Sequence, residues 1–143
     1  MLGASVTSAR MAEFLSPSWI AELDAAARGA DGLRVTDGDL IVEQVVRGRP
    51  DGDVCYQMRI GPDGTRVVSR GVDAPDADLV LLTDYPTARA LHEGRVRAQD
   101  ALAAGLLKVQ GRPEVFAKRA DLLARLDDAF APVRAVTTFP DGQ

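Results

Sequence analysis

The 143-residue sequence contains one cysteine, one histidine, two lysines and few aromatic residues. The single cysteine, Cys55, excludes a disulfide within the chain and a cysteine-based zinc site, and it fits a reducing compartment. No apolar run approaches the roughly 18 residues that a membrane-spanning helix needs. The net charge of −4 disfavours nucleic-acid binding, which usually requires a basic face. These features predict a cytoplasmic protein, and the many Arg, Ala, Asp and Gly residues suggest a GC-rich bacterial genome.

The length corresponds to one domain, and 46% hydrophobic residues are sufficient for a core. Residues 1–12 are small and polar and are expected to form a flexible N-terminal tail. The ordered pattern begins at Phe14, so Met11 is an alternative start codon. We expect the folded domain to span residues 13–130 and a C-terminal tail to span 131–143.

The first half of the chain predicts one helix followed by an antiparallel meander. Ser16 and Pro17 suit the start of a helix that ends at Gly29. Three Asp-Gly steps separate four apolar runs, and Asp-Gly favours tight reversals of the chain. The predicted strands cover residues 33–36, 40–47, 54–60 and 65–70. None of the Asp-Gly loops has the terminal Glu of a calcium site, so we interpret them as turns.

The second half of the chain predicts two further strands and three helices. The run 78–83 is almost entirely apolar, which is typical of a strand covered on both faces. Asp84 is placed to cap a helix that ends at Gly94, and a short helix covers about 97–104. The stretch ALAAGLLKVQGRPEVF then predicts a strand at 106–110 between Gly105 and Gly111. A final amphipathic helix extends from Pro113 to Phe130.

Three segments, in order, resemble the sterol-carrier-protein (non-specific lipid-transfer protein) domain family, in its small single-domain bacterial form. They are VCYQMRIGPDGTRVVSRG, DADLVLLTDYPTARALHEG and AQDALAAGLLKVQGRPEVFAKRADLL, and FLSPSWIAEL is similar to the opening helix of such members. The resemblance extends from about Val42 to Leu126. It implies an α+β fold in which helices pack over one face of a five- to six-stranded, mostly antiparallel sheet. It also implies an apolar cavity for a lipid between helices and sheet.

The candidate ligand-binding residues are apolar side chains that the predicted strands and helices could direct toward such a cavity. They are Met58, Ile60, Val80, Leu82, Leu102, Leu106, Val109, Phe116, Leu123 and Phe130. Apolar spacing does not distinguish a ligand cavity from a filled core, and for any single one of these residues we favour ordinary core packing. An apolar wall also discriminates weakly between ligands, so the sequence does not identify the ligand.

The sequence provides no recognisable catalytic set, metal site or cofactor motif. His92, the only histidine, precedes Gly94, where a surface or helix-capping role is expected. Cys55 alternates onto the strand face opposite Tyr56 and Met58 and is interpreted as a small buried hydrophobe. Asp84 and Asp100 fit helix ends, and GRPDGD at 48–53 lacks the Lys-Ser/Thr of a phosphate-binding loop. An isomerase would need a buried carboxyl beside Tyr56 or Tyr85.

The sequence therefore leaves three hypotheses of different classes. The first is a non-catalytic carrier of a lipid, fatty acyl or sterol-like molecule. The second is an accessory interaction or dimerisation module with a filled core. The third is a small isomerase or hydrolase of hydrophobic substrates. A homodimer through the exposed edge strand or through residues 131–143 is compatible with the first two. A cavity of hundreds of Å³ would favour a ligand, and an exposed apolar patch would favour a partner.

Overall fold

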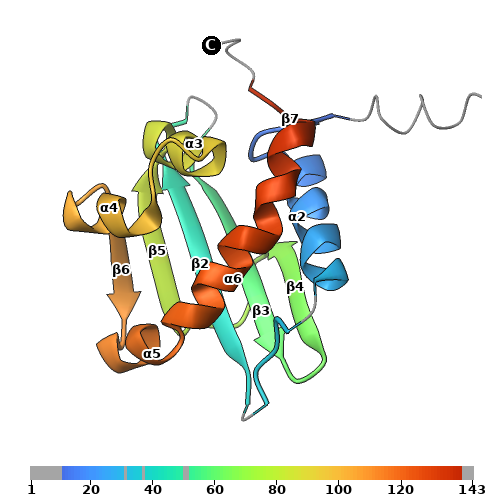
Figure 1. Ribbon diagram of the computed structural model, residues 1–143, viewed down its shortest axis with the longest axis vertical. Coiled ribbons are helices and arrows are strands. Elements are labelled where there is room, and N and C mark those ends of the chain that lie inside the picture. The colour runs from blue at the N-terminus through green and yellow to red at the C-terminus, as the bar shows by residue number, and fades with distance from the viewer. Residues whose placement is uncertain (1–10, 31, 37, 50–51, 140–143) are drawn as a thin grey trace, which may run out of the picture.

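The computed structural model describes residues 11–30, 32–36, 38–49 and 52–139, which form an α+β fold (Figure 1). Five strands make one sheet, two short strands make a second, and the helices lie over one face. In chain order the elements are β1 (Ala12–Glu13), α2 (Pro17–Gly29), β2 (Leu40–Arg47), β3 (Val54–Gly61), β4 (Gly64–Ser69), β5 (Leu79–Asp84), α3 (Tyr85–Glu93), α4 (Ala98–Ala103), β6 (Leu107–Gly111), α5 (Pro113–Lys118), α6 (Ala120–Phe130), the 3₁₀-helix η1 (Ala131–Val136) and β7 (Thr137–Thr138).

The five-stranded sheet has the order β4-β3-β2-β5-β6. Only the β2–β5 pair is parallel, and the other three pairs are antiparallel, so the predicted mostly antiparallel sheet is confirmed. In this register Val42 lies between Met58 and Leu79, and Gln44 lies between Tyr56 and Leu81. Side chains that are paired across strands point to the same face. These residues therefore all share the face that the helices cover.

Burial along β3 confirms the predicted alternation for that strand. Tyr56, Met58 and Ile60 are buried on the helix side. On the other side of the sheet, Gln57 is also fully buried. Its amide nitrogen donates to the carbonyl oxygen of Pro75 at 2.9 Å and to Glu43 Oε1 at 3.1 Å. The loop at 71–77 thus covers this part of the second face and supplies the hydrogen bond that a buried amide requires.

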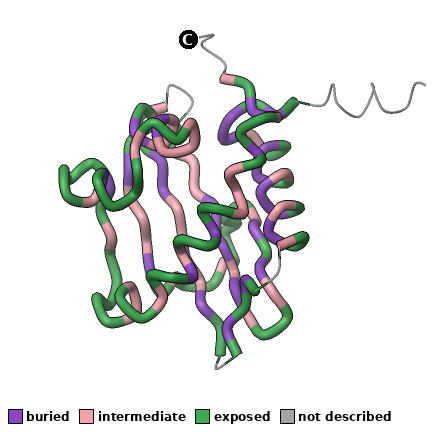
Figure 2. Tube along the Cα trace, in the orientation of Figure 1, coloured by how far each residue is buried: buried purple, intermediate pink, exposed green. Residues whose placement is uncertain are grey.

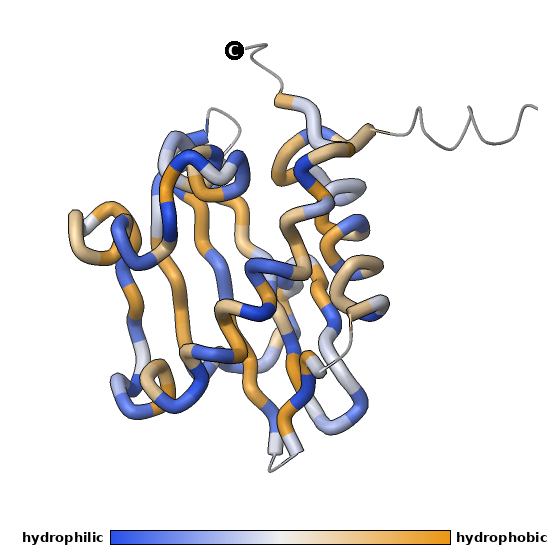
Figure 3. The backbone as a smooth tube through the Cα atoms, viewed as in Figure 1, coloured by the Kyte–Doolittle hydropathy of each residue, from blue (hydrophilic) through white to orange (hydrophobic). Residues whose placement is uncertain are grey.

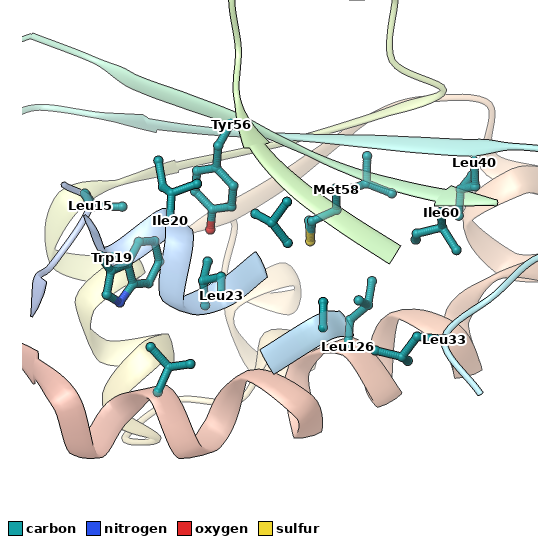
Figure 4. Packing of buried hydrophobic residues seen from close by; sticks show 14 of the residues in the cluster. Leu15, Trp19, Ile20, Leu23, Leu33, Leu40, Tyr56, Met58, Ile60 and Leu126 are labelled. Atoms are coloured by element: carbon teal, nitrogen blue, oxygen red, sulfur yellow. The ribbon is translucent and has the colours of Figure 1, made fainter. Parts of the chain in front are cut away.

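The core is densest where α2 and α6 pack against β2, β3 and β4. Phe14, Leu23, Ile60 and Leu79 are each 1% exposed or less. Figure 4 shows Trp19, Ile20 and Leu23 on α2 facing Tyr56 and Met58, with Leu126 on α6 nearby. Each fully buried side chain of this size contributes roughly 1.5–3 kcal/mol relative to its exposed state.

Helix α2 also protects the outer edge strand β4. Asp24 is 7% exposed, and its Oδ1 accepts a hydrogen bond from the Val67 backbone N–H at 2.8 Å and from Arg66 Nε at 3.0 Å. Burial alone would raise the pKa of Asp24, but the bonds from Arg66 and Val67 and the charges of Arg66 and Arg28 lower it overall. An edge strand normally presents unpaired N–H groups, so this carboxylate removes a site of edge-to-edge pairing.

Three predicted elements differ from the structure. Residues 33–36 do not form a strand, although Leu33 and Val35 are buried and the Val35 N–H donates to the Gly61 oxygen. A single hydrogen bond does not build a ladder. The predicted final helix divides at Arg119 into α5 and α6, because the backbone of Arg119 leaves the helical region. Strand β5 is covered by helices on one face only, so Val80 and Leu82 are half-buried on the other.

The prediction of a C-terminal tail from residue 131 is wrong for residues 131–139. Val133 of η1 and Thr137 of β7 are buried, and β7 pairs in parallel with β1. Ala12, predicted to end the N-terminal tail, is 3% exposed in β1. Short apolar runs without clear periodicity, such as 131–138, become ordered only through partners far away in sequence. Residues 1–10 and 140–143 lie outside the described residues, as do Asp37 and Asp51 of two predicted turns.

Candidate functional site

The helix-covered face is packed unevenly from one side of the sheet to the other. In Figure 1, α6 crosses in front of β2, while β5 and β6 lie to one side of it, with α3 and α4 above and α5 below. Figure 2 shows buried positions along α2, whereas β5 and α3 are mostly intermediate and α4 and α5 are mostly exposed. Under α2 the apolar side chains are excluded from water. On the helix side of β5 and β6, Leu79 and Leu107 are also buried, whereas Leu81 and Val109 are half-buried.

A set of half-buried apolar side chains marks this looser half, and we call it the half-buried cluster. Its members pack against the core and come from β5, β6, α3, α5 and α6. They are Leu81, Tyr85, Ala88, Val109, Val115, Phe116, Leu123 and Phe130. A surface of this kind is what an apolar ligand or an apolar partner would cover.

The structure places the ten candidate ligand-binding residues in five different environments. Val109, Phe116, Leu123 and Phe130 belong to the half-buried cluster. The remaining six residues lie elsewhere. Met58 and Ile60 are closed core residues (Figure 4), Val80 and Leu82 lie on the opposite face of the sheet, Leu102 is half-buried in α4, and Leu106 is exposed after α4.

Four cluster members, Leu81, Tyr85, Ala88 and Val115, were not among the sequence candidates. Leu81 belongs to the unbroken apolar run Leu79–Leu82, in which alternation alone does not show which residues face the helices. The register with β2 shows that Leu81 faces the helices, since Leu81 lies beside Gln44 on that side of the sheet. For Tyr85 and Ala88, the sequence feature that could have identified them is the helix cap at Asp84. Its side chain accepts a hydrogen bond from the Thr87 N–H at 2.9 Å and so fixes where α3 begins.

Two surface hollows lie away from the half-buried cluster. One, of about 580 Å³, is lined by the end of α2 and the start of β4, including Ala27, Leu33 and Thr65. The other, of about 440 Å³, lies between α2 and β3 and includes Leu15, Ile20 and Cys55. Neither hollow lies over the half-buried cluster, so neither is the apolar cavity that was predicted between the helices and the sheet.

Polar groups on the helix side adjoin the apolar interior. Tyr56 is buried, and burial, with a smaller effect of the Asp127 charge, raises its pKa, so its hydroxyl keeps its proton. Gln44 Nε2 donates to the Leu81 carbonyl oxygen at 3.3 Å. Asp127 is exposed. Partial desolvation of its carboxyl, and next the Asp128 charge, raises its pKa, and the Arg134 charge opposes this shift. Of these groups, Gln44 is half-buried beside Leu81 and is able to orient a polar end of a bound molecule.

Aromatic residues, although scarce in the sequence, gather at one end of the molecule. Five of the seven, together with His92, form a continuous set of ring contacts. The ring centroids of Phe14 and Trp19 are 5.0 Å apart, those of Phe14 and His92 5.4 Å, and those of Trp19 and Tyr56 5.8 Å; Phe14 also contacts Tyr85 and Phe139. No sequence pattern predicts this assembly, because its members span residues 14 to 139. It joins both ordered ends of the chain to the sheet.

His92 lies inside this aromatic set and not at the surface as expected. Its Nε2 is 2.9 Å from Thr137 Oγ1, whose proton is donated to the Val133 oxygen at 2.7 Å, so Nε2 carries the proton. Burial, followed by the Arg134 charge, lowers the pKa of His92 to about 4. The ring is therefore neutral near pH 7 and engaged in structure.

Cys55 lies half-buried on the far face of the sheet. Burial, and next the Glu43 charge, raises the pKa of its thiol, which disfavours the nucleophilic thiolate. Among the residues that the structure describes, no group of three His, Cys, Asp or Glu side chains could hold a metal ion. In the same part of the chain, no helix is both long and apolar enough to cross a membrane.

Solved structures with a similar fold cover most of this chain. A crystal structure of sterol carrier protein 2 superposes with a TM-score of 0.66 at 20% identity, covering 83% of this chain and 98% of the other. A conserved hypothetical protein from Thermus thermophilus gives 0.67 at 20% identity, covering 94% and 97%. The chain has the fold of sterol carrier protein 2. The fold class expected from the sequence resemblance is confirmed.

Two further structures with the sterol carrier protein 2 fold carry names that refer to function. Palmitated SCP2L2 from Aedes aegypti matches with a TM-score of 0.55 at 16% identity, covering 79% of this chain and 91% of the other. The UbiJ-SCP2 ubiquinone synthesis protein matches with a TM-score of 0.52 at 15% identity, covering 91% and 95%. No protein-family model and no curated protein matches the sequence.

Proposed function

We propose that this chain binds and carries a hydrophobic small molecule, of the lipid, fatty-acyl or sterol-like class, without transforming it. The observation that supports the proposal is the half-buried cluster over β5 and β6, on the helix side of a sterol carrier protein 2 fold. The name of the palmitated Aedes aegypti protein supports an acyl chain as one such ligand. The single cysteine supports a reducing, cytoplasmic location.

Apolar burial is sufficient to hold such a ligand. Each buried CH₂ group contributes about 0.8 kcal/mol, so a long acyl chain gains on the order of 10 kcal/mol before the loss of its freedom of motion is subtracted. Micromolar binding corresponds to about 8 kcal/mol and is therefore within reach. The ligand would lie against Leu81, Val109 and Leu123, and its polar end would be oriented by Gln44, which lies beside Leu81.

Adjacent leucines on opposite faces of β5 provide a matched test of this site. Leu81 lies on the helix side within the half-buried cluster, and Leu82 is half-buried on the far side of the sheet. In titrations with a fluorescent fatty acid, Leu81→Gln should weaken binding about fivefold or more, because it places an amide against the acyl chain. Leu82→Gln should change the affinity by less than about twofold.

Thermal unfolding of both variants controls for loss of the fold. Equal weakening by the two substitutions, with both variants folded, would show that the helix side is not the binding surface. Retention of full affinity by Leu81→Gln would show the same.

The second candidate is an accessory interaction or dimerisation module with a filled interior. It is supported by the position of the two hollows, which lie away from the half-buried cluster. In that case wild-type protein would show no saturable uptake of the fatty-acid probe. A third candidate, an isomerase using Tyr56 and Asp127, would show a substrate-dependent absorbance change with an activated steroid.

A further inference from the structure

The five-stranded sheet has two outer edges, and they differ in what covers them. At the β4 edge, α2 lies alongside, and Asp24 Oδ1 accepts a hydrogen bond from the Val67 N–H at 2.8 Å. The other edge strand is β6, and α4 and α5 lie at its two ends (Figures 1 and 3). In the part of the chain that the structure describes, β6 pairs with β5 alone. Such an edge is a template on which a further strand can pair.

The hydrogen-bond pattern of the sheet shows which backbone groups β6 directs outward. The Arg70 N–H donates to the Cys55 oxygen at 3.1 Å, so the odd-numbered residues of β3 bond to β4. Backbone groups of successive residues point to opposite edges of a strand, so this assignment can be followed through the registers of β2 and β5 to β6. It directs the N–H and C=O groups of Lys108 toward β5 and those of Leu107 and Val109 outward.

Leu106, immediately before β6, supports this assignment and adds an apolar surface to the edge. Its carbonyl oxygen accepts from Thr83 Oγ1 on β5 at 2.9 Å, as expected for a residue that shares the orientation of Lys108. Its side chain is 48% exposed, and Val109 is half-buried. Apolar side chains beside outward-pointing backbone groups are typical of a surface that another protein strand covers.

We infer that β6 pairs with β6 of a second copy of this chain, antiparallel and centred on Val109, so that two sheets join into one. In this register the partner's Val109 lies opposite Val109, the partner's Gly111 lies opposite Leu107, and the partner's Gln110 lies opposite Lys108. Residues with outward backbone groups then face one another along the full length of β6. The pairing goes beyond the proposed carrier function, and it requires neither a ligand nor a filled interior.

Lys108, the only charged residue of β6, selects this register. A shift of the centre to Lys108 would place the partner's Lys108 directly opposite, and a shift to Gln110 would place the partner's Arg112 there. Like charges directly opposite each other destabilise a pair of strands. With the centre at Val109, Lys108 instead meets a neutral amide, which can accept a hydrogen bond from the lysine. Of these three registers, only the one centred on Val109 makes β6 complementary to itself.

The pairing would also join the two half-buried clusters. Residues directly opposite each other point to the same face, so the helices of both copies would cover one face of the joined sheet. The partner's Val109 would then lie against Val109, at the side of the cluster that is farthest from α2. Leu106 would lie opposite the partner's Arg112, whose aliphatic stem can cover an apolar side chain.

Sedimentation equilibrium of the full chain over a range of concentrations tests the pairing. Wild-type protein should approach twice the mass of the chain as the concentration rises. Gln110→Lys should weaken the dimer about fivefold or more, because it places a lysine opposite Lys108 at two symmetry-related positions. Gln110→Glu should strengthen the dimer by a similar factor, because it places a carboxylate there. Val72→Lys adds the same charge at a 98% exposed position away from β6 and should leave the dimer unchanged.

Disulfide cross-linking reports on the register. In a Cys55→Ser background, a mixture of Lys108→Cys and Gln110→Cys should form disulfide-linked dimers under mild oxidation. The Cα atoms of such a non-hydrogen-bonded pair lie about 4.5 Å apart, within the range that a disulfide spans. Each variant alone should cross-link at least about fivefold more slowly, because identical positions are then diagonal neighbours about 7–8 Å apart.

Three results would overturn the inference. They are wild-type protein that remains a monomer at several hundred micromolar, equal effects of Gln110→Lys and Val72→Lys, and cross-linking of Lys108→Cys alone as fast as in the mixture. Both measurements are made without ligand, so their failure leaves the carrier proposal untouched. Absence of fatty-acid binding would likewise leave the pairing of β6 untouched.

Discussion

Gly111 is the residue that allows α5 to follow β6 almost directly. Its backbone has φ +120°, and a Cβ atom at this position would clash with the Asp78 carbonyl oxygen and lie 3.2 Å from Leu79 Cδ2. Gly111 is the last residue of β6 and pairs with Leu79 on β5. Only glycine combines this conformation with such close contact between two backbones. The sequence shows the glycine but not the neighbouring strand that makes it necessary.

Replacement of Gly111 by alanine should therefore destabilise the protein by about 2–4 kcal/mol, through both backbone strain and the clash with Asp78. Gly71 is a matched control because it has no positive φ, and a Cβ atom added to it would meet no atom within 4 Å. Gly71→Ala should change the free energy of unfolding by less than about 0.5 kcal/mol, or increase it slightly. Urea unfolding of both variants measures the difference, and equal effects would contradict this account of β6.

His92 links protonation to the stability of the fold. Its pKa is lowered to about 4 in the folded protein, while the unfolded chain takes up the proton near pH 6.5. Between these values the unfolded state binds more protons, so this histidine makes stability fall as the pH decreases from about 6.5 toward 4. The slope approaches about 1.4 kcal/mol per pH unit at most. Glu93 favours the charged ring and Arg134 opposes it.

Urea unfolding as a function of pH, compared between wild type and His92→Gln, isolates this contribution. Acidic groups titrate in both proteins, so the difference between the two curves reports on His92. The wild type should lose more stability than the variant between pH 6.5 and 4.5. A difference that stays constant over this range would contradict the buried, neutral state of the ring.

At the scale of elements, the sequence predicts those parts of the fold whose local signals agree with tertiary packing. Helix α2 begins after Ser16, whose Oγ accepts from the Trp19 N–H at 3.2 Å, and α3 begins after Asp84 and ends at Gly94 as expected. The strands β2 to β6 are recovered to within one or two residues. Local signals fail where order depends on distant residues, as in η1, β7 and the segment 33–36.

The C-terminal segment provides a direct test of that distinction. Val133 in η1 is 4% exposed, although the sequence alone predicts a tail there. Val133→Ala should destabilise the protein by about 1–3 kcal/mol, because it removes two buried methyl groups and leaves a small cavity. Val72→Ala, at a 98% exposed position, should have an effect below about 0.5 kcal/mol. Thermal or urea unfolding that shows no loss in Val133→Ala would restore the prediction of a tail.

At the scale of the whole molecule, the two halves of the helix-covered face are built differently. Beneath α2 the side chains are closed from solvent, with Asp24 sealing the sheet edge, whereas over β5 and β6 the half-buried cluster remains accessible. The sequence predicts the fold class but not this asymmetry, because the same apolar residue types occupy both halves. The register between β2 and β5 and the path of α6 decide which apolar residues stay open. Of the ten sequence candidates, only four lie there.

The central claim is that the open half receives a hydrophobic ligand, and native mass spectrometry of gently purified protein tests it most directly. Retention of a co-purifying molecule of a few hundred daltons, released on denaturation and recovered by organic extraction, is the result that this account predicts. The same preparation of Leu81→Gln should carry less of it than Leu82→Gln. A clean apo mass for the wild type, together with no uptake of a fluorescent fatty acid at micromolar concentration, would contradict the carrier function and favour the interaction module.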